Sequence, residues 1–151
     1  MPERKTIDRA RRAQKQGKSA STQAGEFVRE EIDHVREGRH GARSTKQAIA
    51  IGLSKARRAG VKLPPPEKGS VSEPTHRKAV RDYQIARSGR RSNPSRKRAR
   101  ATSKALKREG RAAASKEALS KQATSAAKRR SHASKSRAAT KAAHTRARSR
   151  S

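Results

Sequence analysis

The stretch Ser44–Pro66 reads STKQAIAIGLSKARRAGVKLPPP and carries signals for both ends of a helix. Ser44 and Gln47 have the spacing of a capping box, in which two side chains satisfy free backbone amides at a helix N-terminus. Gly60 suits the left-handed residue that follows many helices, and the three closing prolines prevent the helix from continuing. We therefore predict a helix over residues 44–59.

A second amphipathic segment, QAGEFVREEIDHVREG, precedes this helix and ends at Gly38. Its bulky apolar residues recur at i, i+4 and i+7, the spacing of one helical face. We predict a helix over residues 23–37 that pairs with the helix at 44–59, whose own apolar face we assign to Ile49, Leu53 and Ala56. The first helix is locally acidic, since it holds five of the twelve Asp and Glu residues: Glu26, Glu30, Glu31, Asp33 and Glu37.

The composition argues against a large core. Apolar residues make up 29% of the 151 residues, charged residues make up 36%, and the formal net charge is +30. Low hydrophobicity combined with high net charge is typical of chains that cannot bury enough apolar surface to offset the entropy of ordering. We therefore predict a mostly disordered chain with a small all-α element, a helical hairpin, between low-complexity basic arms that form partial helix.

Four segments follow from this interpretation. Residues 1–22 form a basic disordered leader, and residues 23–63 form the helix-loop-helix unit. Residues 64–95 form a linker containing Pro and Gly, within which the pattern favours a short helix over 76–87. Residues 96–151 form a tail rich in Ala, Lys, Arg and Ser.

The tail predicts a polyanionic partner. Residues 91–151 hold 20 Lys and Arg residues but only two acidic residues, and they contain no aromatic residue. Basic residues release counterions when they neutralise phosphates, whereas single-strand binders stack bases on aromatic side chains. We therefore expect non-sequence-specific binding to duplex DNA, as in a nucleoid-associated, histone-like protein. The candidate nucleic-acid-binding residues are Lys46, Lys55, Arg57, Arg58, Lys62, Arg96, Lys97, Arg98, Arg100, Lys104, Lys107, Arg108, Lys128, Arg129 and Arg130.

Two alternatives stay open at this point. One is an RNA- or ribosome-associated basic protein, and the other is a protein-interaction module that docks through the acidic helix. A two-helix unit of about 40 residues is smaller than most domains that fold alone. It therefore forms a homodimer, docks on a partner, or is only marginally stable.

Other classes of function lack support in the sequence. The chain contains no Cys, which excludes disulfides and thiolate metal sites. The five His residues are scattered, and His34 and His40 do not share a helix face, so we expect no metal, no cofactor and no enzymatic activity. No apolar run approaches the ~18 residues of a membrane span. We expect a cytoplasmic protein located on the nucleoid.

The segment at 44–60 resembles the core of DUF6496, a family of short, basic bacterial proteins of unknown function. The family's hallmark is close to S-R-K-Q-A-I-A-I-G-L-S-E-A-R-x-A-G, and here Thr45 replaces the Arg and Lys55 replaces the Glu. The resemblance covers about 40 residues and implies a bacterial source, but it implies no activity. The tail is similar in composition to the tails of linker histones and of some bacterial nucleoid proteins. The positions that match the hallmark are Ser44, Lys46, Gln47, Ala48, Ile49, Ala50, Ile51, Gly52, Leu53, Ser54, Ala56, Arg57, Ala59 and Gly60.

Overall fold

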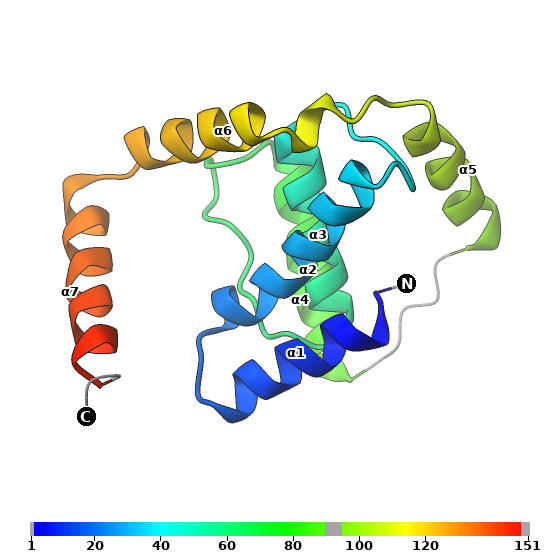
Figure 1. Ribbon diagram of the computed structural model, residues 1–151. Coiled ribbons are helices and arrows are strands. Elements are labelled where there is room, and N and C mark those ends of the chain that lie inside the picture. Colours follow the sequence, from blue (N-terminus) through cyan, green and yellow to red (C-terminus); the bar gives the residue numbers. More distant parts are fainter. Residues whose placement is uncertain (1, 90–94, 149–151) are drawn as a thin grey trace.

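Helices account for most of the chain in the computed structural model, which describes residues 2–89 and 95–148 (Figure 1). The described residues contain no strand. The helices, in chain order, are α1 (Arg4–Lys15), α2 (Ala20–Arg36), α3 (Thr45–Arg58), α4 (Glu73–Ser88), α5 (Arg96–Lys107), the short 3-10 helix η1 (Ala112–Ala114), α6 (Lys116–Lys128) and α7 (His132–Arg148).

The α2–α3 pair forms the centre of the fold through a face of small residues. Ala48, Gly52 and Ala56 recur every four residues on α3, and all three are buried against α2. A side chain at Gly52 would meet the backbone of α2, because a Cβ there would lie 2.6 Å from the Cα of Val28. The predicted face of Ile49, Leu53 and Ala56 is therefore partly right: Ala56 is buried and Leu53 packs against the core, but Ile49 is only partly buried, and Ala48 and Gly52 complete the contact.

The ends of α3 are close to those predicted. The Ser44 hydroxyl accepts a hydrogen bond from the Gln47 backbone amide at 3.2 Å, as a helix N-cap does. At the other end Gly60 has a φ of +96°, and Val61 N–H donates to the Ala56 carbonyl. This Schellman ending buries Val61 against the core. The local signals in the sequence thus correctly predicted where this helix begins and ends.

The N-terminal leader is helical, which corrects the prediction of a disordered arm at 1–22. α1 packs against α2, and Thr6, Ala10 and Ala13 are buried. The contact joins Ala10 to a cluster around Phe27 of α2, with Ile7 partly buried beside it. The alanine face of this helix is a weak apolar signal in the sequence, although it fits closely against another helix.

The end of α5 and the segment after it lie against the α2–α3 loop, which corrects the prediction of a disordered tail. Ala113 and Ala114 of η1 are buried in a cluster with residues from α2, α3 and the loop between them. Two backbone hydrogen bonds secure the contact: Gly41 N–H donates to the Leu106 carbonyl, and Ala42 N–H donates to the Gly110 carbonyl. We call residues 106–114 the docked segment.

Two side chains of the α2–α3 unit also hold the docked segment. The Thr45 hydroxyl donates to the Ala113 carbonyl at 2.6 Å, and Arg36 Nε donates to the Ala114 carbonyl at 2.9 Å. Both bonds join residues far apart in the sequence. The docked segment is therefore part of the folded core and does not belong to a free tail.

The prediction of a mostly disordered chain is therefore wrong, since the described chain forms an all-α fold. α4 lies against α3, where the Ser54 hydroxyl donates to Asp82 at 2.7 Å, whereas α5 and α7 contact no other described helix. Figure 1 shows α7 standing apart from the central helices. The predicted linker at 64–95 contains α4, and its residues 90–94 lie outside the described range. Alanine-rich segments form helices because Ala has the highest intrinsic helix propensity.

The contact at Gly52 predicts that replacing this glycine by alanine lowers stability, which is the opposite of the usual effect inside a helix. Gly52→Ala should destabilise the protein by about 1–3 kcal/mol, because the added methyl group overpacks the α2–α3 contact. Gly25→Ala is the matched control in α2, where a Cβ meets nothing within 4 Å, and it should stabilise the protein by about 0.5–1 kcal/mol. Chemical denaturation of both variants measures the difference, and equal effects at the two positions would contradict the close contact.

Gly41 provides a test of the docked segment. A Cβ on Gly41 would overlap the carbonyl group of Glu109, whereas a Cβ on Gly110 meets nothing within 4 Å. Gly41→Ala should therefore release the docked segment, and Gly110→Ala should leave it in place. Hydrogen exchange of the Ala42 amide should become faster in the first variant only. Unchanged protection in Gly41→Ala would show that the docking does not depend on this contact.

Candidate functional site

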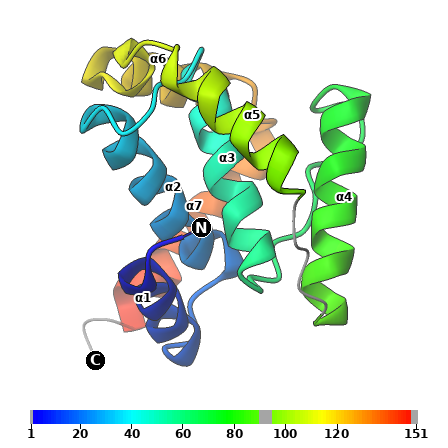
Figure 2. The same cartoon turned by 90° about the vertical axis from the view of Figure 1, so that its right-hand side faces the viewer.

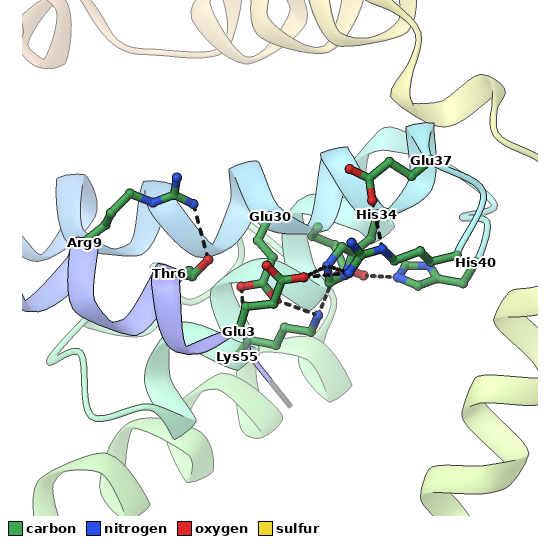
Figure 3. Close-up of polar contacts among 10 residues, drawn as sticks. Glu3, Thr6, Arg9, Glu30, His34, Glu37, His40 and Lys55 are labelled. Carbon is green, nitrogen blue, oxygen red and sulfur yellow. Dashed lines mark hydrogen bonds and ion pairs between the residues drawn. The ribbon is translucent and has the colours of Figure 1, made fainter.

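The cations predicted to face nucleic acid separate into buried and exposed groups. Lys55 of α3 points inward, with Nζ 2.6 Å from Oε2 of Glu31 and 3.6 Å from Oε1 of Glu30 (Figure 3). The side chain of Lys55 is 15% exposed, and those of the two carboxylates are 1–2% exposed. Lys55 therefore neutralises buried carboxylates of α2, and it does not lie on the surface as expected for a phosphate contact.

Arg57 is also occupied inside the fold. Its guanidinium donates to the carbonyls of Leu63 and Pro64, at 3.2 and 3.1 Å, and holds the chain that follows α3. Burial lowers the pKa of Arg57 from its usual value, and the nearby Asp82 carboxylate partly opposes this shift. Arg57 still carries a positive charge at neutral pH because the pKa of an arginine starts far above 7. Its positive charge strengthens the hydrogen bonds to the carbonyls of Leu63 and Pro64.

The remaining predicted cations are on the surface. All thirteen are exposed: Lys46, Arg58, Lys62, Arg96, Lys97, Arg98, Arg100, Lys104, Lys107, Arg108, Lys128, Arg129 and Arg130. They are not gathered into one patch, because α5 and the α6–α7 arm leave the central helices on different sides (Figures 1 and 2).

The most regular arrangement of these cations is on α5. Lys97, Arg100, Lys104 and Lys107 are spaced by three or four residues, so they lie along one face of the helix. At 1.5 Å per residue this stripe is about 15 Å long. We call these four residues the α5 stripe. No residue of α5 is buried, and the four side chains of the stripe are exposed, while Leu106 at the end of the helix contacts the α2–α3 loop.

A cluster of carboxylates and histidines that was not predicted from the sequence lies beside the contact of Lys55 with Glu30 (Figure 3). The backbone amide of Glu3, at the start of α1, donates a hydrogen bond to Oε2 of Glu30 on α2 at 3.1 Å. The Glu3 carboxylate lies 3.1 Å from Nε2 of His34 and 2.6 Å from Nη1 of Arg39. These contacts join the N-terminus of α1 to the C-terminal end of α2.

Hydrogen bonding reinforces the charged state of Glu3 and Arg39 in the exposed part of this cluster. The hydrogen bond to His34, followed by that to Arg39, lowers the pKa of Glu3 below its usual value. The same contact with Glu3, together with the charge of Glu37, raises the pKa of Arg39. Both groups therefore stay ionised throughout the neutral range.

The acidic face of α2 is largely satisfied within the protein. Glu26 pairs with Arg9 at 3.1 Å, Glu30 and Glu31 pair with Lys55, and Glu37 pairs with Arg39 at 2.8 Å. α1, α3 and the docked segment cover the apolar faces of α2. The surfaces that led us to expect a homodimer or a docking partner are therefore already in contact with other parts of the same chain. Homodimer formation stays a prediction.

The position of Lys55 predicts a large effect on stability. Lys55→Ala should destabilise the protein by about 3 kcal/mol, because it leaves two buried carboxylates without their cation. Lys46→Ala removes an exposed lysine from the same helix and should change stability by less than about 0.5 kcal/mol. Thermal and denaturant unfolding measure both changes. Equal stability of the two variants would show that Lys55 is not required inside the fold.

A match to a known protein family spans the central part of this fold. No curated protein and no solved structure matches the chain. Among the described residues, no helix is long and apolar enough to cross a membrane. Residues 15–68, which contain all of α2 and α3 and the turn held by Arg57, match a family of unknown function, DUF6496.

Proposed function

We propose that this protein binds duplex DNA without sequence preference, through the exposed cations of the helices that follow its central bundle. The observation that supports the proposal most directly is the α5 stripe, on a helix that contacts no other described helix. A nucleoid location in the cytoplasm is part of the same proposal.

The stripe has a geometry suited to a phosphate backbone. Duplex DNA carries one negative charge per about 1.7 Å of axis, so a helix of four aligned cations about 15 Å long meets several phosphates at once. Lys and Arg contacts to phosphates position a protein on DNA but read no sequence. The α5 stripe contains only these two residue types, which supports binding that is independent of base sequence.

The residue types of these helices favour duplex DNA over single strands. Residues 95–148 contain no Phe, Tyr or Trp side chain on which an unpaired base could stack. Their acidic residues are Glu109 and Glu117, so little negative charge opposes an approaching polyanion. RNA binding is the alternative, and comparing the affinities for an RNA hairpin and for a DNA duplex distinguishes it from DNA binding.

The salt dependence of binding tests the stripe. Replacing its four cations by Gln should reduce the slope of log K against log salt by up to about 4, since each phosphate contact contributes about 0.9. Gln retains good helix propensity, so α5 should persist. The measurement is fluorescence anisotropy of a labelled duplex over a series of salt concentrations.

A charge-matched variant controls for net charge. Arg4, Lys5, Arg11 and Arg12 are exposed residues of α1, and replacing them by Gln removes the same charge from the central bundle. This control should lose much less of the salt slope. An equal loss in both variants would show that only total charge matters. Tighter binding to an RNA hairpin than to the duplex at the same salt concentration would favour the RNA alternative.

A further inference from the structure

We infer that Glu31, His34 and His40 form a binding site for a divalent transition-metal ion of the Zn²⁺ class. One carboxylate oxygen of Glu31 and one ring nitrogen of each histidine lie within 4.8 Å of one another. Glu31 and His34 are three residues apart on α2, and His40 comes from the loop that follows. Figure 3 shows His34 and His40 converging from these two elements.

The turn after α2 brings the second histidine to the site. Gly38 has a φ of +75°, and Arg39 N–H donates to the His34 carbonyl, so the chain reverses directly after the helix. This reversal places the ring of His40 6.0 Å from the ring of His34, in an edge-to-face arrangement. Two histidines that do not share a helix face thus come together.

The hydrogen bond of His40 determines which nitrogen can bind a metal. Nδ1 of His40 lies 3.0 Å from the Gly41 carbonyl, which only accepts, so Nδ1 carries the proton. In the neutral ring Nε2 is then an acceptor, and it lies 3.3 Å from Oε1 of Glu31. A metal ion between these two atoms would satisfy both of them, as would a proton on Nε2. Metal-binding histidines have this arrangement, with the other ring nitrogen donating to a carbonyl.

Glu31 is a buried carboxylate with capacity for a ligand. Its side chain is 1% exposed, and its oxygens make ion-pair contacts with Lys55 and His40 but no further hydrogen bond in the described chain. Lys55 lies at ion-pair distance from Oε2, which leaves Oε1 facing His40. Lys55 thereby orients the carboxylate as an outer-shell group does, and Glu31 binds the metal through one oxygen.

The local charge is compatible with a divalent cation. The cluster combines four carboxylates with two cations, so a 2+ ion compensates an existing excess of negative charge. Its members are Glu3, Glu30, Glu31, Glu37, Lys55 and Arg39. This excess is local to the cluster, since the whole chain has a formal net charge of +30.

The donor types and the spacing favour zinc over magnesium. Imidazole nitrogens suit Zn²⁺, whereas Mg²⁺ prefers oxygen ligands alone. Tetrahedral zinc with metal–nitrogen distances of about 2.0–2.1 Å places its ligand atoms about 3.4 Å apart. The observed separations require side-chain movements on the order of 1 Å when the ion binds. Three protein ligands leave a fourth position for water.

Titration of the full chain, without a histidine tag, with ZnCl₂ tests the site. Isothermal titration calorimetry should show one site per chain, and a Zn²⁺ concentration of a hundred times Kd should raise Tm by at least about 5 °C. MgCl₂ at the same concentration should raise it far less. Absence of a Zn²⁺-specific shift would overturn the proposal and would leave His40 as a direct partner of Glu31.

Matched histidine variants locate the binding. His34→Ala and His40→Ala should each lose the Tm shift, whereas His144→Ala, an exposed histidine of α7, should keep it. Circular dichroism of the metal-free variants checks that they remain folded. The visible spectrum of bound Co²⁺ reports the coordination geometry, and it should change in the first two variants only. Equal Zn²⁺ binding by all three variants would place the ion elsewhere and overturn the proposal.

Discussion

The architecture depends on how closely α2 and α3 approach each other. One face of α3 consists of the small residues Ala48, Gly52 and Ala56. The backbone of Val28 occupies the space that a side chain at residue 52 would need. This approach brings Lys55 within reach of Glu30 and Glu31. It also aligns the α2–α3 loop with the docked segment. With one Phe and one Tyr in the chain, close contact between small residues replaces the packing of large ones.

Charge is distributed unevenly over this fold. Carboxylates of α2 face inward and are paired with Arg9 and Lys55, while most of the cations of α5, α6 and α7 are exposed. The central helices therefore use opposite charges to hold one another, and the outer helices present an excess of one sign. A single chain thus combines an electrostatically balanced interior with a strongly basic surface.

Local sequence signals predicted part of this structure well. The cap at Ser44 and the reversal at Gly60 are determined by neighbouring residues, so the ends of α3 could be predicted. The burial of Ala10 and Ala114 could not, because alanine is common on both exposed and buried helix faces. Lys55 and Arg57 have the sequence context of surface cations, and only the approach of α2 and the turn at Leu63 turns them inward. The meeting of His34 and His40 depends on the path of the loop.

The docked segment has a consequence for how the chain folds. The hydrogen bond from Thr45 to Ala113 spans 68 residues, whereas α2 and α3 are joined by a loop of eight residues. Long-range contacts form later than local ones because loop closure must precede them. During synthesis the N-terminus emerges first, so α1, α2 and α3 can associate before residue 113 leaves the ribosome. Completion of the core then waits for the C-terminal half of the protein.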